Sequence, residues 1–216
     1  MNITPQIIAA GMGAPLARAT QWLAPIQTAC DRFQINTPLR IAAFVAQCGH
    51  ESMGLARTSE SFDYSIAALP QVFRRITPAL AATLGRQPGE RMVPLERQAR
   101  IANIAYAGQY GNGDSPSGDG FAFRGSGLLQ LTFRANFEAA GTDLSLDLAG
   151  EPDRVRTDPA LAALTAAWFW STKGLNVLAD AGNIQGITKR INKAMLGASH
   201  RKALYVAAKK AMGVAG

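Results

Sequence analysis

Cysteine and histidine are scarce in this chain, with two of each among 216 residues. A scaffold held together by several disulfide bonds is therefore excluded. Cys30 and Cys48 fall on apolar faces of expected helices, so we expect buried free thiols, with one disulfide bond as the alternative. His50 and His200 lie far apart, and neither belongs to a motif with metal-ligand spacing. We expect neither a catalytic metal nor another cofactor.

Long hydrophobic runs are also missing. No stretch approaches the roughly 18 consecutive apolar residues that a membrane-spanning helix needs. The N-terminal residues lack the basic start and apolar run of a cleaved signal peptide. We therefore expect a protein that is made in the cytoplasm and is not stably inserted into a membrane. A GxSxG nucleophile elbow and a phosphate-binding loop are absent too.

Acidic residues are outnumbered, with 15 Asp and Glu against 22 Lys and Arg, a net charge of +7. This balance predicts an anionic partner. The densest basic stretch, residues 189–210, has helical spacing and lacks the interleaved aromatic residues of a base-stacking platform. We expect an anionic cell-envelope surface rather than nucleic acid, although charge alone does not decide between them.

What is present is helical patterning, in a chain of 48% hydrophobic residues that suits one domain or one domain with two lobes. Four helix starts combine a capping residue with proline: Thr4-Pro5, Thr37-Pro38, Thr77-Pro78 and Asp158-Pro159. Four glycines predict helix ends: Gly85, Gly141, Gly174 and Gly213. We expect helices near residues 5–10, 15–33 (kinked at Pro25), 38–53, 66–74, 78–84, 94–106, 133–140, 159–173, 183–193 and 199–212.

Residues 107–127 break this pattern, because they are rich in Gly, Asn, Asp and Ser and are too long for an ordinary connection. The apolar stretches 121–123 and 128–131 are expected to pair as a short β-hairpin. The aromatic run Trp168-Phe169-Trp170 is interpreted as core packing, with a sugar-binding platform as the alternative.

Glu51 and Glu60 are the candidate chemical groups. Glu51 ends an apolar helix that starts at Thr37-Pro38, and on a continuous helix Glu60 would lie about 13.5 Å further along the axis on the opposite face. The chain must therefore turn between them, with Gly54 as a plausible place. A turn could bring the two carboxyl groups to the roughly 6.5–9.5 Å separation of an inverting glycosidase. The alternative is that both are solvated surface charges.

Four blocks of sequence resemble family 19 glycoside hydrolases, the chitinase family that includes bacteriophage endolysins. The blocks are FVAQCGHES (44–52), ESFDYS (60–65), FRGSGLLQLT (123–132) and ITKRIN (187–192). They occur in the family's order. The resemblance implies a mainly α, lysozyme-like fold with two lobes, a single catalytic domain over residues 1–216, and the hairpin at the cleft.

The resemblance also implies roles for individual residues. Glu51 would be the general acid, Glu60 the general base that activates a water, and Thr132 a residue that holds this water. Substrate contacts would come from His50, Tyr64, Gln130, Asn136 and Asn192, and Arg201 matches a buried arginine near the acid. Structural alternatives stay open: Thr132 as a helix N-cap, Asn192 as a helix cap and His50 as a structural histidine.

Two departures from the family pattern concern the cleft wall. Leu128 replaces a proline, and Lys193-Ala194 stand where two glycines are common, which is compatible with a substrate other than plain chitin. The resemblance thus predicts a monomeric phage-type endolysin that cleaves β-1,4 bonds in peptidoglycan strands after a holin-type partner releases it from the host cytoplasm. The alternatives are a chitinase, a non-catalytic glycan-binding or inhibitor protein and a basic nucleic-acid-binding protein.

Overall fold

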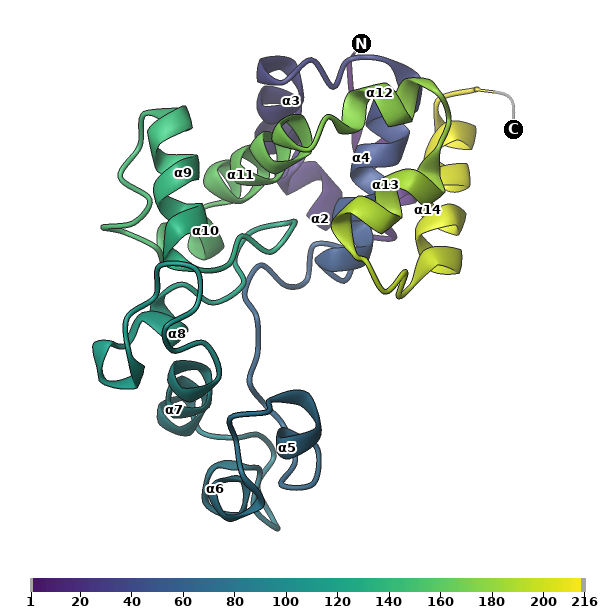
Figure 1. Cartoon of the computed structure of the whole chain (residues 1–216). Helices are drawn as coiled ribbons and strands as arrows, with labels where there is room; N and C mark the ends of the chain where they lie inside the picture. Colours follow the sequence, from purple (N-terminus) through teal and green to yellow (C-terminus); the bar gives the residue numbers. More distant parts are fainter. Residues whose placement is uncertain (1, 215–216) are drawn as a thin grey trace. The chain divides into compact units, whose positions relative to one another are not determined.

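The computed structural model describes residues 2–214, which form helices joined by turns and loops (Figure 1). The chain divides into two compact units. Unit 1 comprises the residues up to Thr58, the short segment Ser126–Gln130 and the residues from Arg154 on. Unit 2 comprises Ser59–Gly125 and Leu131–Asp153. No helix among the described residues is long and apolar enough to cross a membrane.

Each unit is built from its own set of helices. Unit 1 contains α1 (Pro5–Met12), α2 (Leu16–Gln21), α3 (Leu23–Arg32), α4 (Pro38–Glu51), α10 (Arg154–Thr157), α11 (Pro159–Thr172), α12 (Leu175–Asp180), α13 (Ile184–Ile191) and α14 (Ala198–Ala211). Unit 2 contains α5 (Leu69–Val72), α6 (Pro78–Leu84), α7 (Leu95–Ala105), the 3₁₀ turn η1 (Ser115–Ser117), α8 (Asp119–Ala122) and α9 (Arg134–Leu144). The mainly helical fold predicted from the sequence is confirmed.

The four predicted helix starts are all present. The side chains of Thr4, Thr37 and Thr77 each accept a hydrogen bond from a backbone N–H three residues later. The carboxylate of Asp158 accepts one from Ala160 N at 2.8 Å. In each case proline occupies the first helical position, where its missing N–H costs no hydrogen bond.

Three expected helices differ most from the prediction, and the short helices α8, α10 and α12 were not expected. The expected helix over 15–33 is divided at Trp22 into α2 and α3. Pro25 lies at the third position of α3, in the first turn of a helix, where its missing N–H costs no intrahelical hydrogen bond. The expected helix over 66–74 is reduced to the four residues of α5. Gly141 does not end its helix: α9 continues to Leu144, and an added Cβ at Gly141 would lie 2.6 Å from the carbonyl oxygen of Leu146. This glycine is needed for close packing rather than for a helix end.

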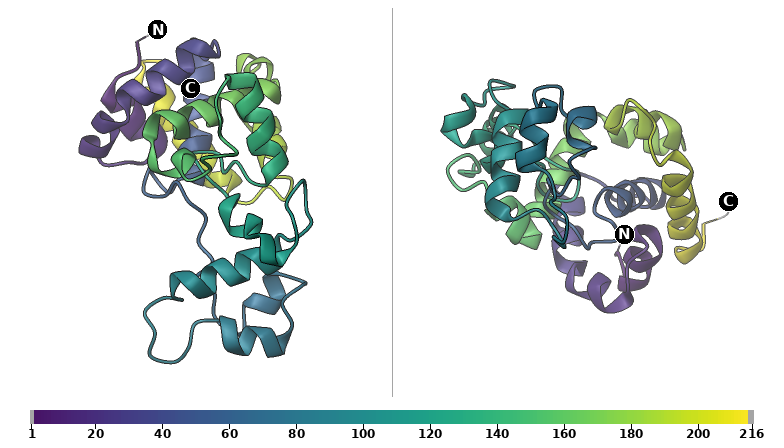
Figure 2. Two further views of the ribbon diagram at one scale, coloured as in Figure 1. Left: turned by 90° about the vertical axis from the view of Figure 1, so that its left-hand side faces the viewer. Right: turned by 90° about the horizontal axis from the view of Figure 1, so that it is seen from below.

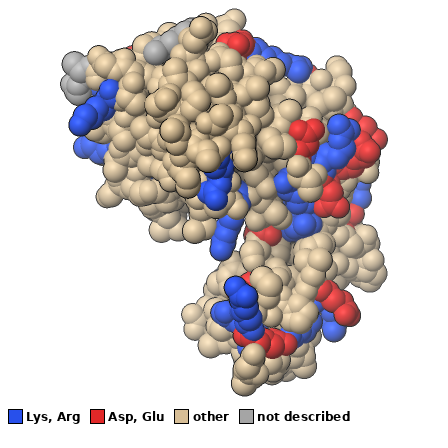
Figure 3. Space-filling view, turned by 180° about the vertical axis from the view of Figure 1, so that it is seen from behind, with Lys and Arg blue, Asp and Glu red and all other residues tan. Residues whose placement is uncertain are grey.

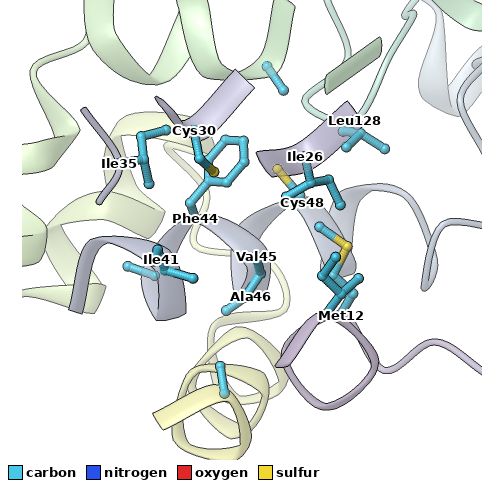
Figure 4. Packing of buried hydrophobic residues seen from close by; sticks show 14 of the residues in the cluster. Met12, Ile26, Cys30, Ile35, Ile41, Phe44, Val45, Ala46, Cys48 and Leu128 are labelled. Atoms are coloured by element: carbon cyan, nitrogen blue, oxygen red, sulfur yellow. The ribbon is translucent and has the colours of Figure 1, made fainter. Parts of the chain in front are cut away.

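α4 forms the centre of the unit 1 core, since every residue from Ile41 to Gly49 is buried. Helices α1 and α14 pack against it and against each other (Figures 1 and 2). α3 and Leu128 contribute further apolar side chains, including the free thiol of Cys30 beside Phe44 (Figure 4). Burying one large aliphatic or aromatic side chain contributes about 1.5–3 kcal/mol, so this cluster fixes the position of the C-terminal end of α4.

Trp170 of the aromatic run in α11 belongs to the same core, and Phe169 packs against it. Trp170 is fully buried, lies edge-on to Phe44 at 5.4 Å between ring centroids, and donates from Nε1 to the side chain of Asn176. Trp168 is 9% exposed. Packing, rather than a sugar-binding platform, is therefore their role. Both cysteines are buried free thiols, as predicted.

Unit 2 has a separate core around Phe62. Its buried members come from α5, α6, α7 and the loops between them. Phe62 contacts the rings of Phe73 and Tyr106 at 5.8 and 5.6 Å, and Tyr64 packs edge-on to Phe73. This aromatic cluster holds the segment that follows Glu60.

The β-hairpin predicted over 121–131 is not formed. Residues 121–122 belong to α8, and the segment that follows is a series of turns in which Gly127 and Gln130 have φ values of 79° and 51°. Left-handed backbone at these positions is incompatible with two paired extended strands. The glycine-rich loop before α8 is also held in place, because Asp119 accepts a hydrogen bond from Gly113 N and pairs with Arg134 of α9.

Candidate active site

Glu51 is the last residue of α4, where the chain turns sharply. Met53, Gly54 and Leu55 all have positive φ values, between 51° and 67°. The buried hydroxyl of Ser52 accepts a hydrogen bond from Leu55 N, which stabilises this turn. Two non-glycine residues in left-handed conformation cost free energy, and such strain is found most often at functional sites. The predicted turn at Gly54 is present.

The Glu51 carboxylate is held by Arg201 of α14, which is fully buried. The Arg201 guanidinium pairs with Glu51 Oε1, donates to Gln47 Oε1 at 2.6 Å, and donates from Nε to the carbonyl oxygen of Leu196 at 3.3 Å. Gln47 in turn donates to the hydroxyl of Thr188 at 3.1 Å. This buried network joins α4, α13 and α14 and leaves the Glu51 side chain 22% exposed.

His50 pairs with the second histidine of the chain. The Nδ1 atoms of His50 and His200 lie 2.9 Å apart, so one ring donates and the other accepts. Burial, followed by the nearby positive charge of Arg201, lowers the pKa of His50, while the charge of Glu51 acts in the opposite direction. The structure thus gives His50 a defined structural partner beside the candidate acid.

Glu60 lies in unit 2 and is supported independently. Tyr106 Oη donates to Oε1 at 2.7 Å, and Gly125 N donates to Oε2 at 2.9 Å. The backbone N–H of Glu60 returns a bond to the carbonyl oxygen of Gly125. Burial raises the pKa of the Glu60 carboxyl, while the two hydrogen bonds and the charge of Arg124 act in the opposite direction.

Tyr64 shares the surroundings of Glu60. Burial, and secondarily the negative charge of Glu60, raises the pKa of its phenol. The same two causes raise the pKa of Tyr106. Both phenols therefore stay protonated at neutral pH, and Tyr106 keeps the proton that it shares with the carboxylate.

The two candidates at the end of the 123–132 block fall in different units. Gln130 belongs to unit 1, has a positive φ and donates to the carbonyl oxygen of Gly127 at 3.1 Å. Thr132 belongs to unit 2, where its carbonyl oxygen accepts from Asn136 at 2.7 Å. The expectation that Thr132 caps a helix is wrong, since α9 begins two residues later and Phe133 occupies the cap position.

Asn136 and Asn192 complete the predicted set. Asn136 is exposed on the first turn of α9 in unit 2. Asn192 ends α13 in unit 1, where its side chain accepts a hydrogen bond from Ala194 N at 3.0 Å. Asn192 occupies the C-cap position of α13, where its backbone N–H donates to the carbonyl oxygen of Thr188. Asn192 begins the loop that Arg201 holds at Leu196, and so the loop is attached to the network around Glu51.

Comparison with known proteins identifies the family. A glycosyl hydrolase family 19 domain-containing protein of Haemophilus influenzae is 39% identical over 164 residues, which is 76% of this chain and 76% of that protein. The chain belongs to glycosyl hydrolase family 19. The family described as class I chitinases matches residues 97–188, a stretch that begins after both glutamates.

Two chitinases extend this comparison. Chitinase 8 of Oryza sativa subsp. japonica is 50% identical over 50 residues, 23% of this chain and 19% of that protein. The crystal structure of a bacterial family 19 chitinase superposes with a TM-score of 0.64 at 19% identity, covering 100% of this chain and 97% of the other. The two chains therefore share the family 19 fold. Together with the relative from Haemophilus influenzae, the family match identifies this protein as a glycoside hydrolase.

Several residues that support the site in this family 19 protein were not predicted from the sequence. Tyr106 and Gly125 bind Glu60, Gln47 binds Arg201, and His200 binds His50. Gln47 carried a signal, because it is a polar residue within the apolar run of the expected helix over 38–53. No signal in the sequence indicated Tyr106, because it lies 46 residues from Glu60, directly after an ordinary amphipathic helix.

Proposed function

We propose that this protein is a phage-type endolysin that hydrolyses β-1,4-glycosidic bonds of bacterial peptidoglycan by an inverting mechanism. Glu51 acts as the general acid and Glu60 as the general base. The observation that carries this proposal is that each carboxylate is held by its own set of donors, in two separate units. Inverting hydrolysis needs two carboxylates in different protonation states, and independent supports allow this.

The surroundings of each glutamate suit its role. Arg201 engages Oε1 of Glu51, which leaves Oε2 to carry the proton for the glycosidic oxygen. In Glu60, each carboxylate oxygen accepts one described hydrogen bond and keeps a second lone-pair position for the attacking water. A pKa raised toward neutrality makes a carboxylate a better base.

Three features support peptidoglycan as the substrate. Leu128 and Lys193-Ala194 depart from the chitinase pattern, and the net charge of +7 suits an anionic wall. Hydrolysis of chitin is the second candidate, favoured by the match to rice Chitinase 8. In either case Tyr64, Gln130, Asn136 and Asn192 would contact the sugars, Thr132 would help hold the water, and His50 would line the site. For the endolysin, a holin-type partner would give access to the wall.

Digestion of purified peptidoglycan and purified chitin tests the proposal. We expect soluble fragments from peptidoglycan, with the bond identified by mass spectrometry of the new reducing end and inverted configuration in the proton NMR spectrum of fresh product. Glu51→Gln should lose about 10²–10⁴-fold in rate while its melting temperature is kept. Glu96→Gln, at an exposed position of α7, is the matched control. Cleavage of chitin alone would show a chitinase, and retained configuration would exclude the inverting mechanism.

A further inference from the structure

The positive charge of this protein belongs to its C-terminal segment. Residues 1–180 contain 15 Lys and Arg and 15 Asp and Glu, whereas residues 181–216 contain 7 Lys and Arg and no acidic residue. The whole net charge of +7 is therefore carried by one sixth of the chain. In Figure 3, the surface near the C-terminal end shows Lys and Arg atoms without neighbouring acidic ones.

A groove of about 780 Å³ lies within this basic segment, between the start of α13 and the outer side of α14. Its basic residues are Lys202, Lys209 and Lys210. Its apolar residues include Ile184, Tyr205 and Val206, of which Val206 is 50% exposed. The Lys209 ammonium lies 5.7 Å from the centre of the Tyr205 ring, which positions this charge at the apolar wall.

The lining of this groove indicates the chemistry of its ligand. Sugars and nucleic-acid bases are bound by stacking on exposed aromatic rings. Tyr205 is the one aromatic residue after position 180, and it is only 8% exposed. An apolar groove with ammonium groups around it instead complements a molecule with an anionic head and a hydrocarbon tail.

We propose that this groove binds an anionic phospholipid and docks the α14 face on the surface of an anionic bilayer. The phosphate would lie among Lys202, Lys209 and Lys210, and part of an acyl chain would contact Val206 and Ile184. Juxtamembrane lysines attract anionic lipid surfaces, and a partly exposed apolar residue among them adds burial. The docking extends the proposed function by naming a membrane partner, but it involves no catalytic residue.

Vesicle binding of the full-length protein tests this inference separately from catalysis. Sedimentation with large unilamellar vesicles should show binding when they contain phosphatidylglycerol and little binding when they contain only phosphatidylcholine. The triple variant Lys202→Gln/Lys209→Gln/Lys210→Gln should bind at least about tenfold more weakly. Val206→Gln, which keeps every charge, should also weaken binding. Circular dichroism and thermal unfolding confirm that each variant is folded.

The chain offers a matched control, because its six lysines divide equally between the groove and other positions. Lys173→Gln/Lys189→Gln/Lys193→Gln removes the same charge outside the groove and should bind nearly as well as the wild type. If both triple variants lost vesicle binding equally, the groove would not be the binding site, and the binding would be unspecific electrostatic attraction. Unchanged binding of Val206→Gln, or equal binding to both vesicle types, would also overturn the proposal.

Discussion

At the scale of single residues, the chemistry of Glu60 depends on groups that oppose one another. Burial raises the pKa of its carboxyl, while the hydrogen bonds from Tyr106 and Gly125 favour the ionised form. In the proposed mechanism Glu60 is the base, and a base must be ionised to accept a proton from water, so these donors would set the lower pH limit of activity. The proposed mechanism therefore makes Tyr106 a positioning residue that would act through Glu60.

We expect Tyr106→Phe to move the acid limb of the kcat/KM profile to higher pH. Loss of the hydroxyl removes a donor to the carboxylate, which raises the pKa of Glu60 further and leaves the base protonated over a wider acidic range. Measurement of kcat/KM against pH on a soluble oligosaccharide checks the shift. Tyr110→Phe is the control, because Tyr110 is 69% exposed and packs on Phe133. An unshifted acid limb with a lower rate would show that Tyr106 does not act through Glu60.

At the scale of elements, α4 is positioned by contacts that only glycine permits. An added Cβ at Gly49 would lie 2.4 Å from Cα of Met12 in α1, and one at Gly11 would lie 2.4 Å from the side chain of Val45. α1 and α4 therefore lie so close together that the glycine backbone of each helix contacts the other helix directly, at the backbone of Met12 and at the side chain of Val45. Since Glu51 follows Gly49 by two residues, this packing also fixes the candidate acid.

We expect Gly49→Ala to destabilise the protein even though alanine is the better helix former. The clash is with backbone, which cannot move aside as a flexible side chain can, and overpacking typically costs about 1–3 kcal/mol. The melting temperature should fall by roughly 2–4 °C for each kcal/mol. Gly186→Ala in α13 is the comparison, because the three atoms nearest to its added carbon all belong to the side chain of Asn183 rather than to backbone. An unchanged melting temperature for Gly49→Ala would contradict the close packing.

At the scale of the whole molecule, the net positive charge is concentrated in one segment of the chain. The net charge is carried by residues 181–216, which belong to unit 1 together with Glu51. One of these basic residues, Arg201, is buried against Glu51, whereas Lys202, Lys209 and Lys210 line the groove on α14. Charge of this kind acts on encounter with a substrate surface rather than on bond cleavage. Its effect is long-ranged and weakens with salt, since the Debye length is about 10 Å at 0.1 M.

We expect the rate of lysis of whole, permeabilised cells to fall as salt rises. The rate on a short, uncharged oligosaccharide should change much less, because diffusion of a neutral molecule is not steered. Both rates are measured over the same salt series, with the melting temperature followed as a control for stability. Equal salt sensitivity for the two substrates would show that the positive charge acts within the active site or on stability.

The sequence by itself determined the capped helix starts and the family. The capped starts at Thr4, Thr37, Thr77 and Asp158 depend on residues within one helical turn, so they were predictable from local pattern. The four blocks of the resemblance predicted family 19, which the relative from Haemophilus influenzae confirms. The roles of Glu51 and Glu60 stay a prediction that follows from the same blocks.

Only the tertiary structure decided what surrounds the two glutamates. The residues that contact them, Arg201 and Tyr106, lie 150 and 46 residues away. Their contacts depend on how helices pack, which no local pattern determines; Arg201 was predicted through the family resemblance alone. The turns that replace the hairpin and the passage of α9 through Gly141 have the same cause. In both places, close packing and left-handed backbone outweigh the local preference that the sequence shows.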